Sequence, residues 1–183
     1  MINALDIFLK SDKKLFFHIQ SDVTFNDWQK VLNLALDTIN KYDAWIYAPY
    51  VENLYRNFLR TYEQIEENIE WVNVVDETVW MVDRKLIEIF FEDKINDAFT
   101  DNFYGWGYDK VFSLICLLNK KKNILDYRLR LNHPKKQNYD STEANKCFRK
   151  MLSLLPNNLH EKFGKMEHNP EKFFQDVVLT SRY

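Results

Sequence analysis

Glycine is scarce in this chain: among 183 residues there are only Gly105, Gly107 and Gly164. A protein built from many β-hairpins normally needs more glycine, because tight turns between strands use positive φ angles. The scarcity of glycine therefore favours helices over a sheet made of successive hairpins.

Long apolar runs are also missing. The longest, Phe112–Leu118, is interrupted by Ser113 and is far shorter than the roughly 20 residues that span a bilayer. The N-terminus lacks the basic region and the cleavage site of a secretory signal. Cysteine is limited to Cys116 and Cys147, which do not have the spacing of a redox or metal motif. We therefore expect a cytoplasmic protein with free thiols and no membrane segment.

The composition, 46% hydrophobic and 28% charged, is that of an ordinary globular protein, and the length predicts a single domain over residues 1–183. Asp27 follows Thr24 ahead of apolar residues at helical spacing, which predicts a capped helix from about residue 25 to 41.

The N-terminal residues leave two interpretations open. Leu5–Leu9 and Leu15–Ile19 flank a polar turn. Periodicity allows either a short β-hairpin or two helical pieces there.

The middle of the chain has an apolar stripe at helical spacing from Val51 to Ile69, and this rhythm continues to Phe90. Because so long a helix is unusual, we expect a break near residues 68–76 and a second helix capped by Asp76. Further helices are predicted over residues 111–118, from Ser141 to just before Pro156, and from Pro170 onwards, with a polar connector over residues 133–140. The predicted fold class is all-α, a compact bundle of about six or seven helices, with the N-terminal hairpin as an open alternative.

The charge is unevenly distributed although the total is only −2. Residues 1–61 carry seven basic and seven acidic side chains, residues 62–109 carry three and thirteen, and residues 110–183 carry fifteen and seven. The middle segment also contains ten large aromatic residues, four of them within residues 103–108. Aromatic side chains supply contact area at interfaces, and carboxylates steer a cationic partner.

We therefore predict a surface for a basic protein partner in this segment. The candidate residues are Glu66, Glu70, Asp76, Glu77, Asp83, Glu88, Asp101, Phe103, Tyr104, Trp106, Tyr108 and Asp109.

Arg128 and His133 enclose four residues, and this Arg-x4-His spacing resembles the active-site motif of the HEPN ribonucleases. In that all-helical family the arginine and the histidine act on RNA from paired motifs at a dimer interface, so the resemblance implies that Arg128 and His133 are alternative catalytic residues. Leu129 departs from the family, where a polar residue usually follows the arginine. The same spacing arises by chance in chains of this composition, and Arg128 and His133 are then simple surface residues.

Other chemical motifs are weak. The cluster of His160, Glu161, Glu167 and His168 does not have the spacing of a zinc motif, and there is no Gly-rich phosphate loop. We expect neither a metal nor a cofactor. A basic strip from Lys120 to Lys136 is an alternative nucleic-acid surface, although the total charge favours a solvated face instead.

A small cytosolic chain without a catalytic constellation, and with an acidic aromatic segment, resembles the immunity proteins of bacterial contact-dependent growth inhibition systems. The resemblance is one of overall character. It implies that the chain binds a cognate toxin, often a basic nuclease domain, and blocks its active site. An HEPN-like ribonuclease and a nucleic-acid-binding accessory protein are the alternatives.

Overall fold

The computed structural model describes residues 1–54, 59–134 and 140–179, and a six-stranded mixed sheet lies at its centre. The strands are β1 (Leu15–Ile19), β2 (Ala44–Val51), β3 (Thr61–Glu66), β4 (Ile69–Val72), β5 (Val79–Asp83) and β6 (Lys122–Leu131). Their order across the sheet is β1-β5-β2-β6-β4-β3. The pair β2 and β6 is parallel, and the other neighbouring pairs are antiparallel.

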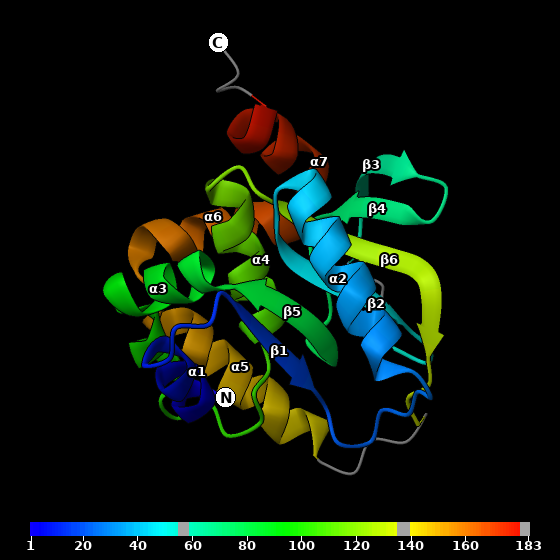
Figure 1. Cartoon of the computed structure of the whole chain (residues 1–183). Helices are drawn as coiled ribbons and strands as arrows, with labels where there is room; N and C mark the ends of the chain where they lie inside the picture. Colours follow the sequence, from blue (N-terminus) through cyan, green and yellow to red (C-terminus); the bar gives the residue numbers. More distant parts are fainter. Residues whose placement is uncertain (55–58, 135–139, 180–183) are drawn as a thin grey trace.

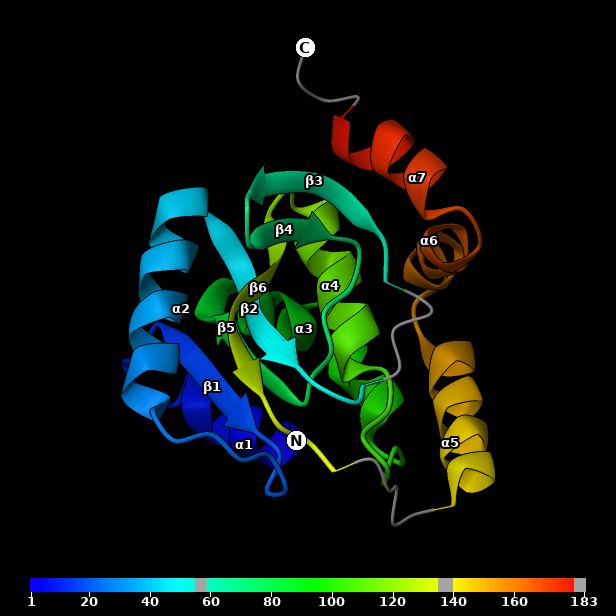
Figure 2. The same cartoon turned by 90° about the vertical axis from the view of Figure 1, so that its right-hand side faces the viewer.

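The described helices divide between the two faces of the sheet. They are α1 (Ile2–Leu9), α2 (Trp28–Tyr42), α3 (Arg84–Glu92), α4 (Tyr108–Leu118), α5 (Ser141–Leu154), α6 (Asn157–His168) and α7 (Pro170–Phe173), with a 3₁₀ helix at Ile95–Phe99 and a π-helical turn at Phe174–Leu179. Figures 1 and 2 show α2 on one face and α3 and α4 on the other, with α5 and α6 outside α4. No described helix has the length and apolarity needed to cross a membrane.

The larger hydrophobic core fills the space between the sheet, α1, α3 and α4. Phe112 of α4 lies between two aromatic residues, with ring centroids 5.4 Å from Trp80 and 4.8 Å from Phe90. All three side chains are buried. A smaller core under α2 includes Ala35, Ile39 and Tyr47. A sheet covered on both faces needs two such apolar sets.

The helix predicted over residues 25–41 is confirmed as α2. The side chain of Asp27 accepts a hydrogen bond from the N–H of Lys30 at 2.9 Å, so the helix begins at Trp28 and not near residue 25. It ends at Asp43, whose left-handed conformation terminates the helix. The buried residues Val31, Ala35, Thr38 and Ile39 form the face against the sheet.

The predicted all-α bundle is wrong, and the protein is a mixed α/β structure. The helix expected between Val51 and Ile69 contains β3, and the helix expected from Asp76 begins with β5 before α3; residues 55–58 lie outside the described residues. Apolar positions three or four apart also occur in irregular or bulged strands, so the apolar stripe did not distinguish a helix from a strand. The run of β-branched residues from Val72 to Val82 favours strands for a physical reason, since such side chains pack well on a pleated surface.

Other predicted elements had mixed outcomes. Both interpretations of the N-terminal residues are wrong, because α1 is followed by the single strand β1. The helices predicted at residues 111–118, from Ser141 and from Pro170 are confirmed as α4, α5 and α7. No strand was predicted at β6. Of the predicted connector, residues 135–139 lie outside the described residues.

The scarcity of glycine did not exclude a sheet, because other residues take the left-handed turn positions. Asp43, Asn53, Lys94 and Lys120 have φ values between 51° and 63°. In addition, the parallel connection from β2 to β6 needs no tight hairpin. The scarcity of glycine was therefore a poor predictor of helices, because non-glycine residues occupy turn positions with positive φ.

An ion pair between a buried carboxylate and a partly exposed arginine joins β6 to β2 and α2. Asp126 of β6 has no exposed surface. Its Oδ2 accepts hydrogen bonds from Arg128 Nη2 at 2.6 Å and from the Tyr47 hydroxyl at 3.0 Å. Arg128 Nη2 also donates to the hydroxyl of Thr38 in α2 at 2.6 Å. This network fixes α2 to the two parallel strands at the centre of the sheet.

We expect Arg128→Ala to lower the free energy of unfolding by about 3 kcal/mol or more, because it leaves the charge of Asp126 buried without its partner. Arg130→Ala is the matched control on the same strand. The Arg130 guanidinium lies 5.6 Å from the centroid of the Tyr50 ring and is exposed, so its loss should cost about 1 kcal/mol or less. Urea denaturation measures both changes, and equal losses would contradict the role given to Arg128.

Candidate functional site

The acidic segment 62–109 does not form one continuous surface. It runs from the sheet edge at β3 and β4, through β5, to α3 and the start of α4. Figure 2 shows the β3–β4 hairpin at one end of α4 and the loop that precedes α4 at its other end. The predicted partner-binding residues therefore fall into separate groups.

Most aromatic side chains of this segment belong to the core. Trp71, Trp80, Phe90, Phe99 and Tyr108 are buried. The predicted surface residue Tyr108 is only 3% exposed, whereas Phe103 is 87% exposed and Tyr104 38% exposed. Trp106 is partly buried. Aromatic residues available for a partner are thus limited to the loop before α4.

Several predicted carboxylates have structural partners within the chain. The side chain of Asp83 caps α3 through the N–H of Lys85 at 2.8 Å, and Glu88 pairs with Arg84 at 2.7 Å. Asp76 accepts a hydrogen bond from the N–H of Thr78 at 2.8 Å, and Asp101 forms an ion pair with Lys150 at 2.8 Å. These carboxylates stabilise local structure.

The β3–β4 hairpin, residues 61–72, is called the acidic hairpin here. It contains Glu63, Glu66, Glu67 and Glu70 and no lysine or arginine. Its strand β3 is the last strand at this edge of the sheet. The hairpin therefore presents four carboxylates at an edge that no further described strand covers.

Two of these glutamates are held by neighbours. Glu66 accepts hydrogen bonds from the Lys41 ammonium and the Tyr42 hydroxyl at the end of α2, which lower the pKa of Glu66. Glu70 accepts from the hydroxyls of Thr61 at 2.8 Å and Tyr127 at 3.1 Å.

The other two, Glu63 and Glu67, are exposed, and their carboxylates have no ion pair or hydrogen bond among the described residues. They were not among the predicted site residues. No local pattern in the sequence distinguishes them from Glu66 and Glu70, because Lys41, Tyr42 and Tyr127, which bind those two glutamates, are distant in the sequence.

Packing on its inner side holds the acidic hairpin in place. The ring of Tyr62 stacks on Phe174 after α7, with centroids 4.0 Å apart, and burial raises the pKa of Tyr62. Ile69 is 1% exposed, and β4 pairs with β6. These contacts hold the backbone that carries the carboxylates in one position, so less conformational entropy is lost when a partner binds.

The loop before α4 is held by backbone and helix contacts. Asn102 Nδ2 donates to the carbonyl of Trp106 at 2.7 Å. Gly107 has a φ of 100°, and an added Cβ would lie 2.5 Å from Met151 Cε and 2.7 Å from the Phe148 ring in α5. Gly107 thus packs closely on α5 at the end of the loop that contains the exposed Phe103.

Two acidic side chains meet beneath this loop. The Glu77 carboxylate accepts from the N–H of Asp109 in the first turn of α4, while its Oε2 is buried without a hydrogen-bond partner among the described residues. Burial, and then the charges of Asp109 and Asp76, raise the pKa of Glu77. Burial, followed by the charge of Asp76, raises the pKa of Asp109 to about 7.

The pair Arg128 and His133 does not form a shared site. Arg128 binds Asp126 and Thr38, whereas His133 Nε2 lies 3.5 Å from Asp22. Five residues of extended chain correspond to roughly 16 Å. Arg128 and His133 therefore have separate partners within one chain. The ribonuclease alternative, whose motifs pair across a dimer interface, stays a prediction.

The basic strip is interrupted as well. Lys121 pairs with Asp43 and Arg128 with Asp126, and Lys135 and Lys136 lie outside the described residues. Two of its cations are thus used inside the fold.

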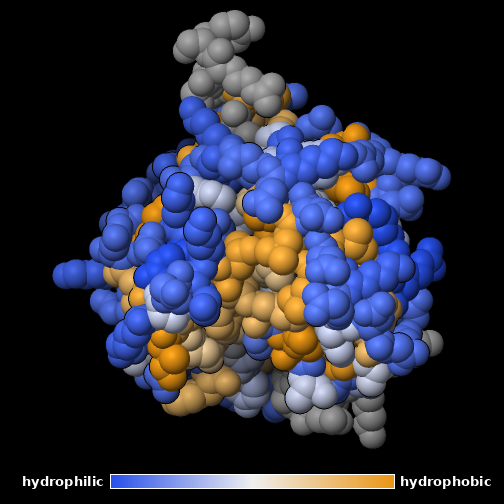
Figure 3. Space-filling model, viewed as in Figure 1, coloured by the Kyte–Doolittle hydropathy of each residue, from blue (hydrophilic) through white to orange (hydrophobic). Residues whose placement is uncertain are grey.

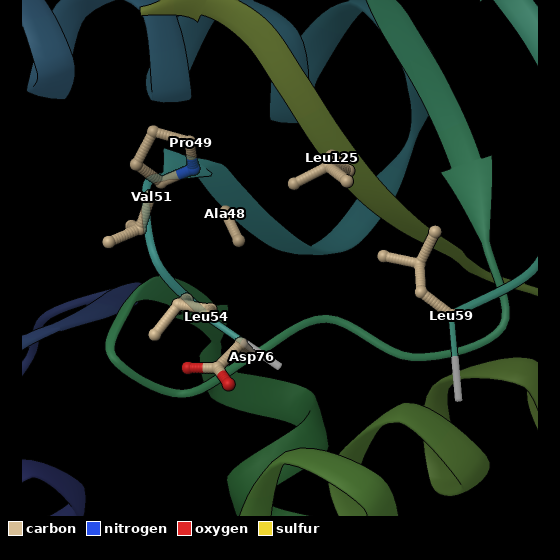
Figure 4. Close-up of a pocket in the computed structure, with 7 residues that line it drawn as sticks. All are labelled: Ala48, Pro49, Val51, Leu54, Leu59, Asp76 and Leu125. Carbon is tan, nitrogen blue, oxygen red and sulfur yellow. The ribbon is translucent and has the colours of Figure 1, made fainter. Parts of the chain in front are cut away.

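Cavities and metal-binding clusters give no stronger candidate. The pocket in Figure 4 is lined by six apolar residues and Asp76, and its volume of about 10 Å³ fits about one water molecule. A wider groove of about 430 Å³ lies between α3, α4 and α6. Within the described residues, no group of three or more His, Cys, Asp or Glu side chains could hold a metal ion.

Comparison with protein-family models and with the sequences of curated proteins finds no match.

We expect Gly107→Ala to lower the free energy of unfolding by about 2 kcal/mol or more, because alanine combines a strained backbone with overlap against α5. Gly164→Ala is the control. No atom lies within 4 Å of a Cβ at this position of α6, so alanine should stabilise the helix by about 1 kcal/mol. Thermal or urea unfolding checks the opposite signs.

Because the pKa of the Asp109 carboxyl group is raised, we expect the stability of the protein to depend on pH. Its pKa of about 7 in the fold lies above the unfolded value of about 4, so the folded protein keeps a proton that the unfolded chain loses. The free energy of unfolding should therefore fall as the pH rises from about 4 to about 7.

Asp109→Asn removes this proton site. Relative to the parent, the variant should gain up to about 4 kcal/mol between pH 4 and pH 8. Asp12→Asn, at a carboxylate whose side chain is 86% exposed, is the control. Urea denaturation across this range gives the measurement, and an unchanged slope in Asp109→Asn would contradict the assignment.

Proposed function

We propose that this chain is an immunity protein, which binds and neutralises a basic cytotoxic nuclease domain through the acidic hairpin. The observation that supports it is the concentration of four glutamates, without any basic residue, on residues 61–72 at an edge of the sheet. A nuclease cleft that receives nucleic-acid phosphates is cationic, so this hairpin has the complementary charge.

The four glutamates would act in two ways. Glu63 and Glu67 carry exposed carboxylates that attract a cationic partner at long range and raise the association rate. Glu66 and Glu70 are held by side chains of α2, β3 and β6, so they offer carboxylates in fixed positions. A rigid carboxylate that occupies a phosphate position would block the substrate as well as bind the toxin.

The proposal replaces the broader surface expected from the sequence. Asp76, Asp83, Glu88 and Asp101 have structural partners, and the eleven residues of α4 separate the loop from the acidic hairpin by about 16 Å. We therefore assign the steering charge to the acidic hairpin. Phe103 and Tyr104 at the loop remain candidates for a second contact.

The experiment uses the protein encoded by the neighbouring gene as the candidate toxin, produced in a catalytically inactive form. We expect Glu63→Lys with Glu67→Lys to lower the association rate constant about tenfold or more at low salt and to weaken its dependence on ionic strength, because exposed charges act over a Debye length of about 8 Å. Dissociation should change little. Stopped-flow fluorescence or surface plasmon resonance measures both rates.

The matched control is Glu92→Lys with Asp93→Lys, at exposed positions where α3 ends. It changes the net charge by the same amount away from the acidic hairpin. Equal effects of the two double variants would reduce the result to total charge and contradict the proposed site. A complete lack of binding, or a failure to protect cells that produce the active toxin, would contradict the proposed function.

A further inference from the structure

The two edges of the sheet differ in chemistry. At the edge opposite the acidic hairpin, β1 has the sequence Leu-Phe-Phe-His-Ile, with no acidic residue, lysine, arginine or proline. It pairs with β5 over five consecutive residues without a register shift. The strand β3, by contrast, has two register shifts. Bulges and charges protect a sheet edge from pairing with another chain, and β1 has neither.

The backbone hydrogen bonds of β1 show which groups are available. The N–H of Gln20 donates to Thr78 at 2.9 Å, and the carbonyl of Lys14 accepts from Arg84 at 2.8 Å. Even-numbered residues therefore direct their backbone groups towards β5. In an antiparallel ladder this alternation leaves the N–H and C=O of Leu15, Phe17 and Ile19 at the outer edge.

Apolar side chains lie beside this edge. Figure 3 shows an apolar area over β1, β5 and the neighbouring flank of α2. Ile19 is 36% exposed, Leu36 of α2 is 42% exposed, and Leu15 and Phe17 are partly buried. Since the side chains of residues 15, 17 and 19 share one face of the strand, an added strand would extend this apolar area.

The charges at the two ends of β1 indicate which strand fits. Asp12, Lys13 and Lys14 precede β1, Asp22 follows it, and all four are exposed, so the net charge is +1 before the strand and −1 after it. In an antiparallel pair of two β1 strands centred near Phe17, the lysines of one copy lie beside residues 21–22 of the other. The arrangement repeats at both ends by symmetry, as an isologous interface requires.

We propose that two copies of this chain associate through their β1 strands, antiparallel about a two-fold axis, and join the two sheets into one. The partner is a second copy because β1 is complementary to itself: it has uncharged apolar residues at its centre and opposite charges at its ends. This inference does not depend on the proposed function. In the dimer the acidic hairpins lie at the two outer edges of the joined sheet and remain accessible.

Analytical ultracentrifugation over a wide concentration range tests the proposal. The parent chain should show a monomer–dimer equilibrium. Lys14→Glu and Asp22→Lys should each raise the dimer dissociation constant about tenfold, because each change creates two like-charge contacts by symmetry. The double variant carries the swapped charges and should return to within about threefold of the parent, since each new glutamate meets a new lysine.

A second pair of variants tests the strand itself. Ile19→Lys places a charge inside the apolar interface and should leave the protein monomeric, whereas Leu154→Lys changes a leucine of α5 that is 55% exposed and should leave the dimer intact. Circular dichroism verifies folding, and if Ile19→Lys does not fold, the charge swap alone decides. A parent chain that is monomeric throughout, assemblies larger than dimers, or a double variant that fails to restore the dimer would each overturn the proposal.

Discussion

The ion pair of Asp126 and Arg128 adds a polar connection between α2, β2 and β6, three elements that also share the smaller hydrophobic core. A carboxylate without exposed surface, in the middle of the sheet, is unfavourable unless a cation and hydrogen-bond donors surround it. Tyr47 from β2 and Arg128 from β6 satisfy it, and Arg128 also reaches Thr38 of α2. The parallel pair β2 and β6 and the helix above it are thereby held in one register. This placement also brings the end of α2, with Lys41 and Tyr42, against Glu66 of the acidic hairpin.

Helices with strong local signals could be predicted from the sequence, and strands could not. The boundaries of α2 follow from Asp27 and from the apolar positions behind it, which are local properties. The strand β4 has only four residues and β3 contains two register shifts, so neither shows a clean alternation. Strands of this kind are stabilised by neighbours distant in sequence: Tyr62 depends on Phe174, more than a hundred residues later. Single-sequence periodicity contains no information about such contacts.

The candidate site shows the same division between local and distant information. The acidic character of residues 62–109 could be recognised directly in the sequence. The sequence did not reveal that a turn places Glu63 and Glu67 on an exposed edge, or that Tyr108 lies in the core. Charge alone also did not distinguish carboxylates that cap helices, such as Asp83, from those available to a partner. Sheet topology makes this distinction, because it defines which strand is last. The chain thus has a protected, acidic edge at β3 and an unprotected, apolar edge at β1.

The four left-handed turn residues that replace glycine affect both sides of the folding equilibrium. A non-glycine residue in this region costs roughly 1 kcal/mol, so Asp43, Asn53, Lys94 and Lys120 reduce the stability of the native state. A chain with so few glycines, however, has fewer backbone conformations to lose when it folds. The lower entropy of the unfolded ensemble offsets part of this local strain. The stability of this sheet therefore depends partly on the stiffness of the unfolded chain, a property that no contact in the folded structure reveals.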